Sequence, residues 1–181
     1  NPIAGTTVIL SEITTTCRKT SLITQEARRA GIRLKVKAIM NILESKIIGK
    51  RTQETCEDGI VITDNFIAVV DGSTSKTCTQ ISENEKNGRY CMLLITDYLR
   101  HLSCKTTWEE FCDGVTREIY RHYPEDILDT LSSHPENRMT ASAIVYSHYR
   151  NEIWMIGDCQ GLINGKLLEN GKPDEKRIAK K

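Results

Sequence analysis

Three acidic sites in the sequence lie beside apolar runs of the kind that predicts β-strands. The acidic pairs are Glu57-Asp58, Asp71-Gly72 and Gly157-Asp158, and they border the runs at residues 59–63, 66–70 and 152–156. A carboxylate at the end of a buried strand is held rigidly and still reaches solvent. Several such carboxylates that converge make a site of hard oxygen ligands, which suits Mg²⁺ or Mn²⁺. The pattern therefore predicts a divalent metal site at one edge of a sheet.

Each pair also has an ordinary structural interpretation. An isolated Asp-Gly is most often a turn, and an isolated Glu-Asp pair is usually a solvated surface. Glycine after Asp71 lets the backbone turn sharply and can leave its carbonyl open to a cation. The recurrence of the arrangement at three strand ends favours a shared site over three unrelated turns.

Hairpins are the first elements that must position these pairs. Asp64-Asn65 separates two apolar runs, and Asn164-Gly165 is a strong two-residue turn signal. Further β-rich runs lie at residues 46–49, 143–146 and 152–156, the last two joined by a polar connection. Strands that cluster in hairpins favour antiparallel pairing.

Two helices are expected between the two groups of strands. Apolar residues recur at helical spacing over residues 87–102. A second apolar stripe follows Thr107, which has capping-box spacing to Glu110. Together with the hairpins, these helices predict an α+β fold in which antiparallel sheet packs against helices.

Composition limits the class of protein. The chain of 181 residues has 25 basic and 24 acidic residues and a net charge of +1, so no overall field favours nucleic acid or a membrane surface. Its seven cysteines form no CxxC pair, which argues against a zinc cluster or a dense disulfide framework. No apolar run approaches the roughly 20 residues of a membrane-spanning helix. We expect a soluble cytoplasmic protein without nucleic-acid or membrane partners.

The first 45 residues differ from the rest, because they contain no Phe, Tyr, Trp, His or Asp. No methionine precedes Met40, so residues 1–39 are either sequence from upstream of a natural start or an ordinary N-terminal helix at about residues 24–43. The expected division is an extension at residues 1–45 and one domain at residues 46–181.

The order of the motifs resembles that of bacterial metal-dependent protein phosphatases of the 2C type, the PPM family. The motifs are Glu57-Asp58, the strand at residues 66–72 that ends in Asp71-Gly72, the small-residue stretch at 139–143, and the strand at 154–158 that ends in Gly157-Asp158. The resemblance covers about 120 residues. It implies an antiparallel β-sandwich with flanking helices, in α-β-β-α layering, that is incomplete at the C-terminus.

The resemblance also implies roles for individual residues. Asp71 would bridge two Mg²⁺ or Mn²⁺ ions, and the Gly72 carbonyl and Glu57 would hold one of them. Asp58 would support Glu57, and Asp158 would serve an additional metal position. The implied reaction is hydrolysis of a phosphoserine or phosphothreonine phosphoprotein by a metal-activated water. Two divalent ions can activate such a water and clamp a phosphoryl group without a protein nucleophile.

Several positions depart from the family pattern. Ser73, Thr74, Ser75 and Lys76 follow the Asp-Gly, so the family's general-acid histidine is missing. The phosphate-binding arginine is displaced, which leaves Arg51, six residues before Glu57, as the candidate. The later Asp-Gly and Asp-Asn motifs that complete the family's metal site have no counterpart before Lys181.

Three functions remain open at this point. The first is a phosphoprotein phosphatase that needs the later motifs for activity. The second is a catalytically inactive interaction or regulatory module on the same fold. The third is a small α+β binding domain in which the acidic pairs are turns.

Overall fold

The computed structural model describes residues 40, 42–47, 53–75 and 79–170. These residues form a four-stranded antiparallel sheet in the order β1-β2-β3-β4 and a separate β5-β6 hairpin. The strands are β1 (Asp58–Ile62), β2 (Phe66–Gly72), β3 (Ala141–Ser147), β4 (Glu152–Ile156), β5 (Gln160–Ile163) and β6 (Lys166–Glu169). The prediction of an α+β fold with an antiparallel sheet is confirmed for this part of the chain.

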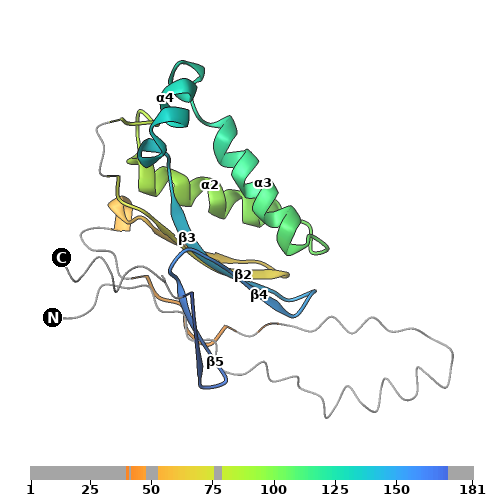
Figure 1. Cartoon of the computed structure of the whole chain (residues 1–181). Coiled ribbons are helices and arrows are strands. Elements are labelled where there is room, and N and C mark those ends of the chain that lie inside the picture. Colours follow the sequence, from red (N-terminus) through yellow and green to blue (C-terminus); the bar gives the residue numbers. More distant parts are fainter. Residues whose placement is uncertain (1–39, 41, 48–52, 76–78, 171–181) are drawn as a thin grey trace, which may run out of the picture.

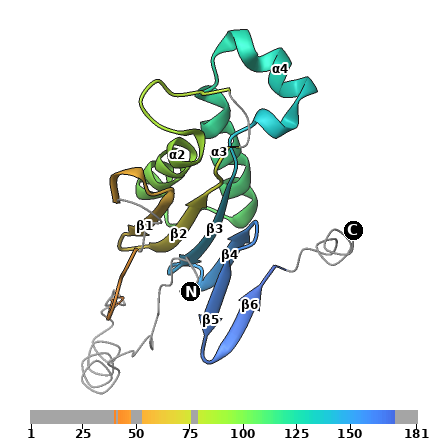
Figure 2. The ribbon, with the colours of Figure 1, turned by 90° about the vertical axis from the view of Figure 1, so that its left-hand side faces the viewer.

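The helices lie on one face of the sheet. They are α2 (Asn87–His101), α3 (Trp108–Arg121) and the short α4 (Leu128–Ser133), with 3-10 turns η1 (Gln53–Thr55), η2 (Glu125–Ile127) and η3 (Pro135–Asn137). Figures 1 and 2 show α2 and α3 above the sheet and the β5-β6 hairpin on its other side. None of the helices in the described residues is long and apolar enough to cross a membrane.

Local sequence signals explain why these elements form. Thr107 is the N-cap of α3, and its reciprocal capping box with Glu110 is formed as predicted. The predicted turn between β5 and β6 is also confirmed, because Asn164 and Gly165 have φ values of 50° and 74°. Two positive φ values in succession are the requirement of a type I′ turn, whose twist matches that of the flanking strands.

Two expectations for the region before residue 48 fail where it is described. Lys46 and Ile47 lie in no strand, although a strand was predicted at 46–49. Leu43 is not helical, so the alternative of an N-terminal helix at about residues 24–43 does not hold at its last residue. The remainder of both segments lies outside the described residues.

The core lies between the sheet and the two long helices. Alternate residues of β2, namely Phe66, Ala68 and Val70, face α2 and α3 and are almost fully buried. Phe111 of α3 stacks on Trp154 of β4 with 5.3 Å between the ring centroids. Because side chains alternate along a strand, the residues between these core positions face the other side of the sheet.

Candidate functional site

A row of polar side chains crosses the sheet at the end where β2 finishes. Asp58 of β1 lies directly opposite Asp71 of β2, and Asp71 lies directly opposite Ser142 of β3. Directly opposite residues of antiparallel strands project to the same face, with Cβ atoms about 4.5–5.5 Å apart. The two carboxylates and the Ser142 hydroxyl are therefore neighbours on the face away from α2.

Asp158 joins this row through Ser142. The Ser142 hydroxyl donates a hydrogen bond to Asp158 Oδ1 at 2.7 Å, and the Asp158 backbone N–H donates to Ser142 Oγ at 3.3 Å. Gly157 makes this approach possible, since it has a φ of +72° and a Cβ there would lie 2.3 Å from Ser142 Oγ. We call Asp58, Asp71, Ser142 and Asp158 the aspartate row.

Cys159 lies within electrostatic reach of all three carboxylates in the row. Burial, which is the largest cause, and the charges of Asp71, Asp158 and Asp58 together raise the pKa of its thiol to about 12. Neighbouring anions act in this direction because they disfavour the negative thiolate. The sequence places Asp58 and Asp158 about 100 residues apart, and the fold brings them to one place.

Glu57 is not part of the row. Side chains of consecutive strand residues point to opposite faces, and the Gly72 N–H donates to the Glu57 carbonyl at 2.9 Å next to the Asp58–Asp71 pair. Glu57 thus points toward α2, where its Oε2 accepts a hydrogen bond from the Thr74 hydroxyl. Its Oε1 is buried and would lie 2.6 Å from a Cβ at Gly88.

The donor chemistry of the row suits a hard divalent cation, since it offers carboxylate oxygens and a hydroxyl. Among the described residues, however, no group of three or more His, Cys, Asp or Glu side chains is arranged to hold a metal ion. The row therefore offers the oxygen ligands that a hard divalent cation prefers, but they do not form a coordination shell. Arg51, the predicted phosphate ligand, lies outside the described residues.

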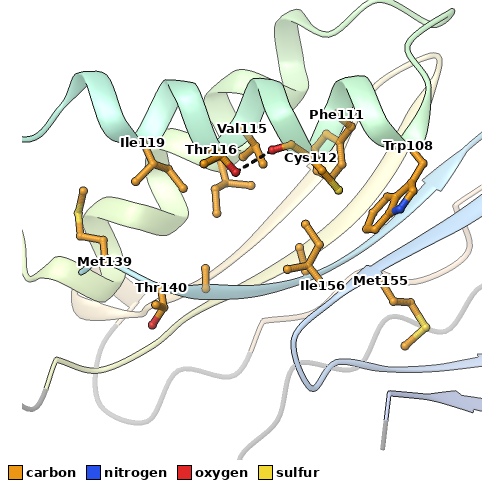
Figure 3. A pocket seen from close by; sticks show the side chains of 13 residues that line it. Trp108, Phe111, Cys112, Val115, Thr116, Ile119, Met139, Thr140, Met155 and Ile156 are labelled. Atoms are coloured by element: carbon orange, nitrogen blue, oxygen red, sulfur yellow. Dashed lines mark hydrogen bonds between the residues drawn. The ribbon is translucent and has the colours of Figure 1, made fainter. Parts of the chain in front are cut away.

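A cavity elsewhere in the molecule is chemically different. It has a volume of about 440 Å³. It lies between α3 and strands β3 and β4, and Figure 3 shows the side chains that line it. Its lining includes Trp108, Val115, Ile119, Met139 and Ile156. Because most of this lining is apolar and lies on the helix side, the cavity belongs to the core layer and not to the aspartate row.

Two residues, one in the aspartate row and one beside Glu57, carried too weak a sequence signal to be assigned a role. Ser142 stands in the small-residue stretch 139–143, and only the register of β2 with β3 places it beside Asp71. Gly88 lies in an amphipathic helical pattern, where a lone glycine suggests a close approach but does not say to what. Here it approaches Glu57 and Ser73.

Comparisons with known proteins give matches among solved structures alone. The search against protein-family models and the search of curated proteins found no match. The structure is similar to that of the serine/threonine phosphatase PstP/Ppp from Mycobacterium tuberculosis, with 19% identity and a TM-score of 0.39 over 65% of this chain and 48% of the phosphatase. It is also similar to PppA, a key regulatory component of T6SS in Pseudomonas aeruginosa, with 15% identity and a TM-score of 0.37 over 62% of this chain and 48% of PppA.

This chain thus spans about half the length of each of these two proteins. At low identity, the first of these two structures is that of a serine/threonine phosphatase, the class of enzyme whose motif order this sequence resembles.

Proposed function

We propose that this chain carries the N-terminal part of a Mg²⁺- or Mn²⁺-dependent phosphatase site that acts on phosphoserine or phosphothreonine in proteins. The observation that carries the proposal is the aspartate row. Asp58, Asp71 and Asp158 come from three separate segments, and each belongs to an acidic pair that the motif order singled out. Three unrelated turns would have no reason to meet at one end of one sheet.

In this proposal, metal is held by the carboxylates of Asp71 and Asp158, the carbonyl of Gly72 and a carboxylate of the Glu57-Asp58 pair. A bound divalent ion would neutralise charge on a phosphoryl group and lower the pKa of a water molecule. The protein's own task is to hold the carboxylates in place. Ser142 fixes Asp158, and the β-ladder fixes Asp58 against Asp71.

The proposal extends to the layering of the fold. Gly161 of β5 lies against Ile144 on the face of the sheet that carries the row, because a Cβ there would lie 2.5 Å from Ile144 Cδ1. We propose that the β5-β6 hairpin begins the second sheet of a sandwich, so that residues 46–181 form part of one phosphatase-like domain. Residues 1–45 would then be an extension, and a chain that starts at Met40 should keep the melting temperature of the full chain.

Metal binding tests the proposal directly. Titration of the purified chain with Mn²⁺ by calorimetry should show binding that Asp71→Asn weakens at least about tenfold, since the substitution removes a ligand charge and keeps the side-chain shape. Asp64→Asn is the matched control, because Asp64 lies in the turn at the other end of the same hairpin. Equal affinity in all three proteins, or no binding by the unaltered chain, would contradict the proposal.

A second function is favoured by a specific observation. The described residues contain no formed group of three metal ligands, and serine follows Asp71-Gly72 where the family commonly has histidine. These features fit a catalytically inactive interaction or regulatory module on the same fold. We expect this chain to be inactive toward p-nitrophenyl phosphate and phosphopeptides. A longer chain that includes the later acidic motifs should gain Mn²⁺-dependent turnover if the first function holds, and none if the second does.

A further inference from the structure

The two residues of the first acidic pair face opposite sides of the sheet. Asp58 is opposite Asp71 in the aspartate row, so its carboxylate shares the row's face. Glu57 precedes it by one residue and packs toward the first turn of α2. Because consecutive residues of an extended strand point to opposite faces, the pair cannot present both carboxylates to one ion.

The surroundings of Glu57 form a tight cradle made by two glycines. A Cβ at Gly72 would lie 2.0 Å from the Gly88 carbonyl oxygen, and a Cβ at Gly88 would lie 2.6 Å from both Glu57 Oε1 and the Ser73 carbonyl oxygen. The end of β2 and the start of α2 thus touch backbone to backbone. The Glu57 side chain fills the remaining space, with one oxygen bonded to Thr74 and the other buried without a hydrogen-bond partner among the described residues.

Helix electrostatics favours a carboxylate at this place. The N-cap residue of α2, Lys86, makes no side-chain capping hydrogen bond. The first turn of a helix carries exposed N–H groups and a partial positive charge, so the Glu57 anion is stabilised beside Gly88. The same carboxylate holds Thr74, which follows Asp71 by three residues.

From this geometry we propose that Glu57 is a positioning residue that joins the first turn of α2 to the segment after Asp71, and that Asp58 provides the acidic pair's carboxylate toward the metal. This inference rests on the proposed function for the role of Asp58, whereas the positioning role of Glu57 stands on its own contacts. It differs from the assignment that the family resemblance implies, in which Glu57 holds the ion and Asp58 supports it.

Three variants of the full chain test the division of roles. Glu57→Gln should leave Mn²⁺ affinity within about twofold, because the side chain does not face the ion, and should speed amide hydrogen exchange in residues 73–75 and the first turn of α2 about tenfold. Gly88→Ala should reproduce that exchange change, because the added methyl displaces the Glu57 carboxylate. Asp58→Asn should weaken Mn²⁺ binding at least about tenfold and leave the exchange pattern unchanged.

Each outcome decides between the two assignments. Loss of Mn²⁺ affinity in Glu57→Gln with unchanged exchange would overturn the inference and restore the assignment from the resemblance. If the unaltered chain binds no Mn²⁺, the proposed function fails, and the exchange measurements still decide the positioning role. If Glu57→Gln does not fold, Thr74→Val removes the partner hydroxyl instead. Thr74→Val should then speed exchange in residues 73–75, and unchanged exchange in that variant would overturn the inference.

Discussion

The two faces of the four-stranded sheet differ in burial and in polarity. The face toward α2 and α3 is closed, and Phe66, Val70, Leu99 and Phe111 on this side are at most 1% exposed. The opposite face carries the aspartate row and, further along β1, Ile62, which is 49% exposed. The first face therefore holds most of the buried core, and the second carries the polar side chains of the candidate site.

This contrast explains how one strand can serve both purposes. In β2, Val70 is fully buried in the core, while the next residue, Asp71, points to the other face and is exposed. The two-residue period of a strand lets adjacent positions carry opposite requirements. A rigid core side therefore fixes the position of the carboxylates without touching them.

The largest effect should come from the closed face. Phe111→Ala removes a fully buried ring that stacks on Trp154, so we expect the free energy of unfolding to fall by about 3–5 kcal/mol. Ile62→Ala on the other face should cost less than about 1 kcal/mol, because the side chain is half exposed. Urea denaturation of both variants measures the difference. Equal losses would mean that the two faces are equally packed.

Gly157 tests how tightly the second face is built around Asp158. Gly157→Ala combines a positive φ with a Cβ 2.3 Å from Ser142 Oγ, and we expect a loss of about 2–3 kcal/mol. Gly165→Ala is the matched control, since Gly165 has a φ of +74° and nothing within 4 Å of an added Cβ. It should cost only the backbone strain, about 1 kcal/mol. Melting temperatures of the two variants isolate the collision with Ser142, and similar values would show that Ser142 moves aside freely.

A buried thiol gives the closed face a pH dependence. Burial raises the pKa of Cys91 from 9.0 to about 12, so the folded state retains a proton that the unfolded chain loses. The stability from this group is complete below pH 9 and is lost progressively as the pH rises toward 12. Between pH 8 and pH 10 the loss should be about 1.4 kcal/mol.

Cys91→Ala separates this contribution from those of other groups. The substitution lowers stability at every pH because it removes core atoms, but the difference between the two proteins should shrink by that amount from pH 8 to pH 10. Denaturation curves at the two pH values provide the measurement. A constant difference would show that the thiol ionises without opening the core.

The sequence predicted the elements whose signals are local. The hairpin turn at Asn164-Gly165 depends on two residues that tolerate positive φ, and the start of α3 depends on a reciprocal pair three residues apart. Such signals act within a few residues and need no tertiary partner. The segment with α4 and its 3-10 turns was not predicted, because elements of three to six residues are too short to show a hydrophobic period.

The candidate site was predictable in composition but not in arrangement. The acidic pairs at strand ends identified Asp58, Asp71 and Asp158, which the fold places in one row. The face of the sheet to which the Glu57 side chain points was not predictable, because it depends on the register between β1 and β2. A shift by one residue would exchange the faces of Glu57 and Asp58. Register is set by tertiary packing, and motif order carries no information about it.

The smallest effect should come from the outer side of the β5-β6 hairpin, which lies farthest from the closed core. Leu162 and Leu167 are cross-strand partners there and are 62% and 56% exposed. The double substitution Leu162→Gln and Leu167→Gln should change the free energy of unfolding by less than about 0.5 kcal/mol, because these two side chains bury little apolar surface. It should also reduce self-association measured by sedimentation, since exposed apolar pairs promote it.

Leu168→Gln provides the comparison on the inner side of the same hairpin. Leu168 lies opposite Gly161, which approaches Ile144 of the main sheet, and it is less exposed than its two neighbours. We expect this substitution to cost about 1–2 kcal/mol, because it places an amide against the apolar surface of the sheet. A cost for the outer pair as large as that for Leu168 would mean that both sides of the hairpin are packed. The contrast between the closed face toward α2 and α3 and the opposite face would then apply only to the four-stranded sheet. The hairpin would count as part of the closed core.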